Sequence, residues 1–424
     1  MLGACSYWVE DHVAARSDRN FLLLLGDAGL FSLAIVCFDP SVVLSVFMAE
    51  FTRSPLLIGA PAAIKLAGLY LPQLPVAIGV HRFQRIKPLF FWQAAIGRGA
   101  LIGTVAAATL ASNIPPEAVV GLVLGAWLVF SFTEGAATLA WLDLVGDVID
   151  VRLRGAYFGA VQILGGILAV GAGFGVRAAL EAEIAPRTFV PLFAWGFVAF
   201  LLSVICIGLI REHPRTSRPR LDEPTFKQVA TLLRGAQVRR ISLAQILAGS
   251  LQFGLPFYAI FARDRIGLGG EWLGSLIEAQ TLGMSIAGVA WARIANRYGA
   301  RSVVCLSSAV LIVVPLCCWA AELIGAGALV LTAFFLAGAA RGGSQAGFWQ
   351  YTLDLVPAAE RRLFMGLANT ANAPTLLMPL LGGGMLDWGG YPWLFGSSAL
   401  LGVAATLAGL WLPTGRWGSP DSRA

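Results

Sequence analysis

Ionisable residues are scarce in this sequence. Only 13% of its 424 residues are charged, three are histidines, and its six cysteines lack the spacing of a metal site. The sequence contains no phosphate-binding loop and no Gly-x-Ser-x-Gly motif. We therefore expect no catalytic residue, no metal and no cofactor, and a protein that is not an enzyme. A membrane transferase that works with Asp and Arg alone stays open as an alternative.

Targeting and modification signals are also missing. The first twenty residues do not show the basic, apolar and small-residue order of a signal peptide, and no Asn-x-Ser/Thr acceptor occurs. The basic residues behind the net charge of +6 lie in short loops between apolar segments and form no single stripe. We expect no nucleic-acid partner, a lipid environment and a monomer.

Apolar residues dominate the composition. They make up 57% of the chain, which is more than a soluble protein of this length buries. A helix needs about 20 mostly apolar residues to cross a hydrocarbon core of ~30 Å. Twelve such stretches occur, at residues 21–50, 56–80, 89–112, 117–142, 155–180, 189–210, 241–262, 272–295, 302–321, 326–349, 363–386 and 391–412.

The loops between these stretches predict an orientation. If both termini are cytoplasmic, 22 of the 30 Lys and Arg residues lie in cytoplasmic segments and five lie on the opposite side. We therefore expect a multi-pass protein of the cell inner (plasma) membrane. The predicted organisation is an N-terminal cytoplasmic tail (1–20), a six-helix bundle (21–210), a basic cytoplasmic linker (211–240), a second six-helix bundle (241–412) and a cytoplasmic tail (413–424).

The two halves of the chain resemble each other. The sequence LDLV at residues 142–145, after the fourth stretch, recurs at 353–356, after the tenth. Upstream, Gly68 aligns with Gly283 and Arg82 with Arg297 at one common offset. Parallel repeats about an axis along the membrane normal place a substrate path between them. The sequence thus predicts an all-α membrane protein with twelve transmembrane helices in two pseudo-symmetric six-helix bundles.

The loop after the eighth stretch carries a recognisable motif. Residues 296–301 (NRYGAR) resemble the Gly-x-x-x-Asp-Arg-x-Gly-Arg motif of the major facilitator superfamily, with Asn in place of Asp, and residues 81–87 are a more divergent copy. Together with the repeat, this motif makes residues 21–412 similar to that superfamily. The resemblance implies a major facilitator fold, a central cavity lined by the first, fourth, seventh and tenth helices, and a cytoplasmic gate motif that comprises Arg82, Arg85, Asn296, Arg297, Gly299 and Arg301.

Seven ionisable residues lie inside the predicted spans, more than three residues from either end, where facing lipid would cost about 3 kcal/mol each. They are Asp27, Asp39, Lys65, Arg98, Glu134, Glu278 and Arg341. Asp39, Glu134 and Asp27 are the candidates for proton coupling, because desolvation and an approaching cation both change how tightly a carboxyl holds its proton. Asp27 is equally a candidate for a structural ion pair. Arg98 and Lys65 are expected to pair with neighbouring acids inside the first half.

Polar and aromatic residues recur at helical spacing on several stretches. On the fourth, steps of four and three from Trp127 to Trp141 place five such residues along one face. Arg341 is expected to hold a substrate anion, because a guanidinium offers a planar fork of donors. The predicted substrate-binding residues are Arg341, Gln345, Gln252, Gln245, Trp127, Ser131, Thr138, Trp141 and Trp349. The glutamines and tryptophans have a structural alternative, which is to hold helices together.

These residues predict a secondary active transporter that moves a small organic solute by alternating access with coupling to protons. The expected partners are therefore a small-molecule substrate, H⁺ and membrane lipid. Two alternatives stay open. One is a proton-driven exporter of amphipathic or drug-like compounds in place of an uptake symporter. The other is a membrane receptor or scaffold without enzymatic activity.

Overall fold

The computed structural model describes residues 2–72, 75–76, 85–150, 153–181, 184–212, 235–355 and 371–413, and this part of the chain is helical without strands. The first half contributes helices α1 (Leu2–Cys37), α2 (Val43–Ala49), α3 (Pro55–Tyr70), α5 (Lys87–Ala100), α6 (Ile102–Thr109), α7 (Pro116–Val148), α8 (Arg154–Leu180) and α9 (Pro186–Leu209). The second half contributes α11 (Ala236–Ala248), α12 (Leu251–Asp264), α13 (Glu271–Tyr298), α14 (Ala300–Ile324), α15 (Ala328–Leu355), the 3-10 helix η2 (Ala373–Leu377) and α17 (Met378–Leu410).

The twelve predicted stretches all contain helix. Within the described residues, eight helical segments are long and apolar enough to cross a membrane. One of them, Ala373–Leu410, overlaps two predicted stretches, and Gly390 interrupts α17 between them with a positive φ of 71°. The apolar helix α3 and the more polar helices α13 and α15 account for the remaining stretches. The segment predicted as an N-terminal tail, residues 1–20, is helical from Leu2 onward.

Proline and glycine lie at the starts, breaks and ends of several helices, where their backbone properties are needed. Pro55 and Pro116 occupy the first positions of α3 and α7, where their missing N–H is not needed. The helix is interrupted between α1 and α2, where Pro40 lacks the N–H that a continuous helix would need. Gly299 separates α13 from α14 with a φ of 83°, and Gly325 ends α14 in the left-handed region.

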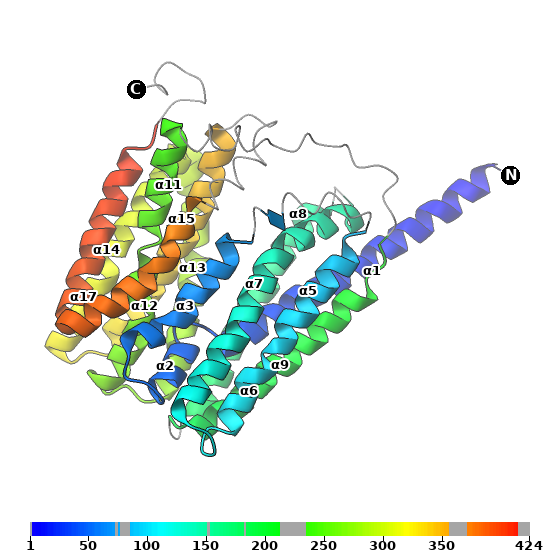
Figure 1. Ribbon diagram of the computed structural model, residues 1–424. Helices are drawn as coiled ribbons and strands as arrows, with labels where there is room; N and C mark the ends of the chain where they lie inside the picture. The colour runs from blue at the N-terminus through cyan, green and yellow to red at the C-terminus, as the bar shows by residue number, and fades with distance from the viewer. Residues whose placement is uncertain are drawn as a thin grey trace.

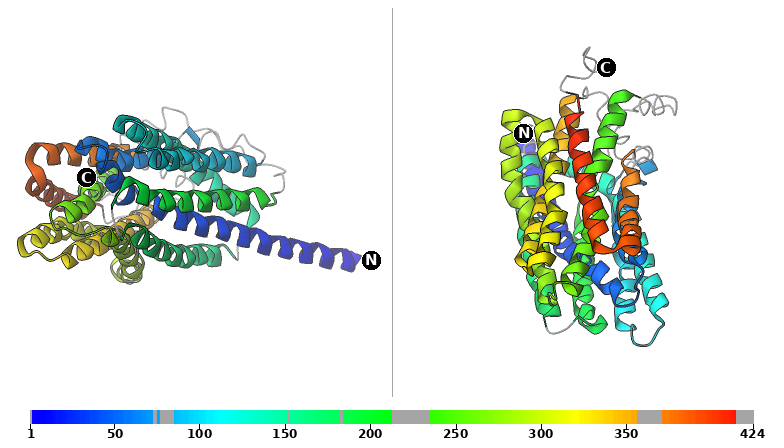
Figure 2. Two further views of the ribbon diagram at one scale, coloured as in Figure 1. Left: turned by 90° about the horizontal axis from the view of Figure 1, so that it is seen from below. Right: turned by 90° about the vertical axis from the view of Figure 1, so that its left-hand side faces the viewer.

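The helices pack as two groups. In the first half, α1 packs on α8 and α9, and α7 packs on α3 and α5; in the second half, α14 and α15 pack together, and α13 and α17 each pack on one of them. Figure 1 shows the first-half helices on the right and the second-half helices on the left, and the view from below in Figure 2 again places them side by side. This is the arrangement of two bundles that the repeat predicts.

Contacts between the two halves are closest at one end of the molecule. We call this end, where α2 is followed by α3 and α12 by α13, the far end, and the end where α9 stops and α11 starts the linker end. At the far end a Cβ at Gly270 would overlap the Leu180 carbonyl, and one at Gly383 would lie 2.8 Å from the Pro55 carbonyl oxygen. Backbone this close leaves no room for a path between α8 and α13 or between α3 and α17.

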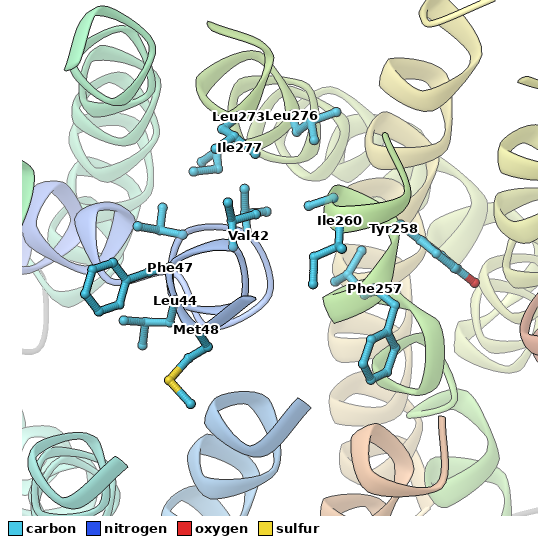
Figure 3. Close-up of a cluster of buried hydrophobic side chains, with 14 of the residues drawn as sticks. Val42, Leu44, Phe47, Met48, Phe257, Tyr258, Ile260, Leu273, Leu276 and Ile277 are labelled. Carbon is cyan, nitrogen blue, oxygen red and sulfur yellow. The ribbon is translucent and has the colours of Figure 1, made fainter. Parts of the chain in front are cut away.

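An apolar plug fills the space between the halves near the far end. Val42 and Phe47 of the α2 region lie in one buried cluster with Ile260 of α12 and with Leu276 and Ile277 of α13. Figure 3 shows Val42 lying beside Ile277 and Leu273 of α13, with Ile260 of α12 close by, whereas the Phe47 ring points away from the second half, toward Phe189 and Phe193. At the rim the Arg263 guanidinium and the Glu50 carboxylate form an ion pair of 2.6 Å, also between the halves. The far end is therefore closed in this structure.

Candidate functional site

A buried arginine joins two carboxylates inside the first half. Arg98 on α5 donates from Nη1 to Asp27 Oδ1 on α1 at 2.7 Å and from Nε to Glu134 Oε1 on α7 at 2.8 Å. Nη1 also donates to the Ser203 hydroxyl on α9. We call Asp27, Arg98 and Glu134 the charge triad. Arg98 therefore has the neighbouring acids expected from the sequence, and Asp27 forms the ion pair that was its structural alternative.

The charge triad carries a net charge of −1 when all three groups are ionised. The arginine side chain is 3% exposed, that of Asp27 is 4% exposed and that of Glu134 is 15% exposed. Phe31 lies 5.1 Å from the guanidinium carbon, which closes one face of the cation. An uncompensated charge in so dry a place is costly, and binding of one proton removes it. Of the two carboxylates, Glu134 is the more exposed.

The charge triad borders a cavity of about 240 Å³. Besides the triad, its walls are formed by aromatic, small and hydroxyl side chains, namely Ala28, Phe31, Ser32, Phe90, Ala137, Thr138, Trp141 and Val161. The cavity lies among α1, α5, α7 and α8.

The stripe predicted on the fourth stretch is divided between two roles. Glu134, Thr138 and Trp141 line the cavity. Trp127 is buried and donates its Nε1–H to the Pro61 carbonyl on α3, at 2.8 Å. Ser131 is also buried, and its backbone packs where a side chain at Gly68 would be. The upper part of this face therefore holds α7 against α3, and only the lower part borders open space.

Asp39 lies at the break between α1 and α2, apart from the charge triad. Its Oδ1 accepts the backbone N–H groups of Ser41 and Val42, both at 2.9 Å. The carboxylate thus satisfies amide groups that the break at Pro40 leaves without helical partners. This capping role occupies one of the two carboxylate oxygens. The charge of Asp39 also interacts with Lys65 on α3.

A second group of charges lies where the two halves meet. Lys65 on α3 interacts electrostatically with Asp39 and with Arg341 on α15, and Arg341 also interacts with Tyr70 on α3. Among the described residues neither Lys65 nor Arg341 has a partner in an ion pair. We call Asp39, Lys65, Tyr70 and Arg341 the interface cluster. With all groups in their usual ionised states, it has a net charge of +1.

A hydrogen-bond chain orients the tyrosine of this cluster. Thr375 donates its hydroxyl to Asn372 Oδ1 at 3.1 Å, and Asn372 donates from Nδ2 to the Tyr70 oxygen at 3.2 Å. Because the Tyr70 oxygen accepts this bond, its own O–H is free to donate elsewhere. Thr375 and Asn372 are buried in the second half, so these hydrogen bonds connect the two halves.

The exposed face of α15 continues from Arg341 toward the linker end. Gln345 and Trp349 follow at steps of four and are exposed, like Arg341. The opposite face packs on α13, where Gly338 meets the Gln280 backbone. Of these three predicted residues, Arg341 interacts electrostatically with Lys65 and Tyr70 of the first half. Gln345 and Trp349 share its exposed face of α15.

Gln245 and Gln252 occupy two separate helices. The break at Gly249 and Ser250 divides the predicted seventh stretch into α11 and α12, so these glutamines do not share one continuous helical face as their spacing suggested. Both are half-buried, and Gln245 Oε1 has no hydrogen-bond partner among the described residues. Gly249 packs against Thr375 of η2, which places the break beside the hydrogen-bond chain of the interface cluster.

The predicted gate motif lies at the linker end. Asn296, Arg297 and Gly299 are exposed around the turn between α13 and α14, and Arg301 donates to the Leu410 carbonyl of α17. In the first copy, Arg85 is exposed, and Arg82 lies outside the described residues. The contact of Arg301 ties two helices of the second half together, and the gating role of the motif stays a prediction.

Sequence reasoning did not identify two members of the interface cluster as functional candidates. Lys65 was expected to pair with an acid inside the first half. No role was predicted for Tyr70, since an aromatic residue is common in an apolar stretch. The available signal was that Lys65 is the only lysine within a predicted span. A lone, flexible cation is rare at such depth without a task.

Comparisons with known proteins agree with this architecture. The sequence model of the Major Facilitator Superfamily matches residues 28–374, and a second match covers 273–422. No curated protein sequence matches the chain.

Solved structures of transporters share the fold over nearly the whole chain. A point mutant of the nucleoside transporter NupG superposes with a TM-score of 0.72 at 15% identity, over 93% of this chain and 99% of that one. A bacterial homologue of the iron transporter ferroportin in an inward-facing state gives 0.71 at 14% identity, over 93% and 98%. A D-xylose-proton symporter gives 0.69 at 14% identity, over 96% and 98%. At such low identity these likenesses show the fold alone, whereas the family match covers most of the sequence: the chain belongs to the Major Facilitator Superfamily and is a multi-pass membrane protein of the secondary transporter class.

Proposed function

We propose that this protein is a proton-coupled secondary transporter of a small organic solute, and that the charge triad is its proton site. The observation that carries this proposal is the surplus carboxylate in the triad, where one buried arginine faces two acids. A protonated Glu134 would leave an ordinary Arg98–Asp27 pair, and an ionised Glu134 leaves one negative charge. The two protonation states thus differ strongly in electrostatic energy, as a coupling site requires.

The solute path runs between the halves in this proposal. The interface cluster and the exposed face of α15 supply the polar groups, and the closed far end supports access from the linker end. The basic loops of the sequence favour a cytoplasmic linker end with both termini on the same side, in the cell inner (plasma) membrane. Alternating access would then require the apolar plug around Val42 and the Glu50–Arg263 pair to open while the linker end closes.

The test uses the purified protein in proteoliposomes with an acidic exterior and a panel of radiolabelled sugars, amino acids, organic acids and organic cations. Uphill accumulation of a panel member, abolished by a protonophore, is expected for the wild type. Glu134→Gln should lose uphill accumulation and keep solute exchange at equal concentrations, because only the proton-binding step is removed. Glu117→Gln, an exposed acid on the same helix, is the matched control and should behave as wild type.

Two results of the same experiment would refute the proposal. Accumulation that is unchanged in both Glu134→Gln and Asp27→Asn would show that the triad is structural and would refute the proton site. Failure of every solute to respond to the pH gradient would refute coupling to protons altogether.

The cavity wall favours a second candidate function, proton-driven export of amphipathic compounds. Phe31, Phe90 and Trp141 surround the acidic pair with apolar surface, which suits a ligand with an aromatic or aliphatic body. An exporter and an uptake symporter differ in the direction of the proton gradient that drives solute into the vesicle. Reversing the gradient in the same vesicles, with protein of known orientation, separates the two.

A further inference from the structure

An apolar groove lies on the surface where α3 of the first half meets η2 and α17 of the second. Its volume is about 500 Å³. Leu56 of α3 forms one wall, and the other wall includes Leu377 of η2 with Leu381, Gly384 and Trp388 of α17. Leu56 is 48% exposed and Leu381 is 57% exposed, so these side chains are open to the surroundings. We call this feature the seam groove. An apolar hollow of this size marks a place where a protein binds an apolar partner.

The seam groove depends on contact between the two halves. A Cβ at Gly383 would lie 2.8 Å from the Pro55 carbonyl oxygen, and one at Gly59 would lie 2.9 Å from the Pro379 carbonyl oxygen. The backbones of α3 and α17 therefore touch over more than one helical turn. Because the two walls belong to different halves, the groove has this shape only while α3 and α17 stay together at the far end.

The direction and length of the seam groove fit an acyl chain. Leu377, Leu381, Gly384 and Trp388 follow one another at steps of four, three and four, so they share one face of the helix. From Leu377 to Trp388 this face rises about 16 Å, which is about half of a hydrocarbon core of ~30 Å. Trp388 marks the far end, because α17 breaks two residues later and Tyr391 then lies 5.9 Å from the guanidinium carbon of Arg265. The groove therefore extends from the far-end surface into one leaflet.

The mouth of the seam groove has the residues of a membrane–water interface. The rings of Trp388 and Trp393 are in edge-on contact with centroids 5.0 Å apart, and both are exposed, as is typical of tryptophan at the level of lipid headgroups. Arg53 precedes Leu56 by three positions, so their Cα atoms are at most about 11 Å apart. Arg53 is exposed and has no ion-pair partner among the described residues, so it is available to a phosphate. Asp387 is exposed as well, which favours a headgroup of low net charge.

We propose that the seam groove binds one acyl chain of a phospholipid from the far-end leaflet, with its phosphate beside Arg53, and that this lipid stabilises the closed far end. A chain held between Leu56 and α17 contacts both halves, so it binds the closed form more tightly than a form in which α3 and α17 are apart. Its stabilising effect grows with the occupancy of the groove. The effect on the far end rests on the alternating access of the proposed function, whereas the binding of the lipid does not.

The binding test uses the purified protein in detergent micelles, native mass spectrometry and palmitoyl-oleoyl-phosphatidylcholine as the probe. Wild type should bind one lipid saturably. A Cβ at Gly384 meets no atom within 4 Å, so Gly384→Leu fills the groove without disturbing a neighbour and should weaken binding at least about tenfold. Gly396→Leu is the matched control, because Gly396 lies on the same helix, also meets no atom within 4 Å and does not line the groove. Arg53→Gln should weaken binding about two- to fivefold, since an exposed ion pair contributes little.

Two results of this test would overturn the proposed lipid site. One is equal binding by Gly384→Leu and Gly396→Leu, which would place the lipid elsewhere. The other is effective competition by dihexanoyl-phosphatidylcholine, which has the same headgroup on short chains, because binding would then depend on the headgroup and not on the acyl chain.

The effect on the far end is measured through Val42→Cys, a buried position of the apolar plug, in a protein whose native cysteines are replaced by alanine. A water-soluble maleimide labels this cysteine only when the far end opens. Adding the probe lipid should slow labelling about threefold or more, also with Gly396→Leu, and should have no effect with Gly384→Leu. Labelling that ignores the lipid in all three proteins would overturn the effect on the far end. Neither readout involves a solute or a proton, so failure here and failure of the proton site at Glu134 are distinguishable.

Discussion

Replacing Arg98 by Gln should destabilise the protein through the two carboxylates that it leaves behind. Asp27 and Glu134 would face each other in a pocket where the side chains are 4% and 15% exposed, without the cation that now bonds to both. Removal of one partner from a buried ion pair costs about 3–5 kcal/mol of the free energy of unfolding. We expect a loss in this range near neutral pH, and a smaller loss as the pH is lowered, because protonation of the carboxyls removes the buried charge.

The measurement is unfolding in mixed micelles by titration with a denaturing detergent, followed by tryptophan fluorescence. A triple variant that combines Arg98→Gln with Asp27→Asn and Glu134→Gln should recover most of the loss, because it leaves no charge in the pocket. Arg293→Gln, which removes an exposed arginine, should change the free energy of unfolding by less than about 0.5 kcal/mol. Equal stability of Arg98→Gln and the wild type, or a triple variant no more stable than the single one, would refute the electrostatic account of the charge triad.

Three further predictions concern the interface and the helix break. Gly274→Ala forces α13 away from the backbone of α8, so a cysteine placed in the far-end plug should be labelled faster. Gly288→Ala, on the same helix, adds a methyl group in open space and should leave labelling unchanged. Asp39→Ala should lower the free energy of unfolding by about 0.5–2 kcal/mol, because the capping hydrogen bonds are lost. Asp39→Asn keeps an acceptor oxygen and should stay within about 0.5 kcal/mol of wild type. Equal losses in the two variants would contradict the capping role. Glu50→Gln removes the ion pair at the rim and should raise labelling of the same plug cysteine. The double variant Glu50→Arg with Arg263→Glu restores a pair of opposite charges and should partly reverse this increase. Unchanged labelling in Glu50→Gln would show that the ion pair does not hold the far end closed.

Much of the architecture was predictable from periodicity and composition. The length of each apolar stretch predicted a helix, and every stretch contains one. The cost of charge in lipid singled out Asp27, Arg98 and Glu134 before any contact was known, and those three side chains do meet. Breaks without a proline at the break itself were missed, such as the one at Gly249, because glycine within an apolar stretch is as compatible with helix packing as with a helix end.

The sequence by itself determined the membrane class, the twelve stretches, the two-fold repeat and the set of residues that cannot face lipid. Only the tertiary structure decided which of those residues are partners: Arg98 pairs with both Asp27 and Glu134, while Lys65 interacts electrostatically with Arg341 of the second half. The reason is physical. Lipid tails and protein interiors are similarly apolar, so an apolar helix face does not encode which neighbour it meets. Close backbone contacts at small residues such as Gly68 and Gly270 make that choice, and the charges then pair with whatever the packing brings near.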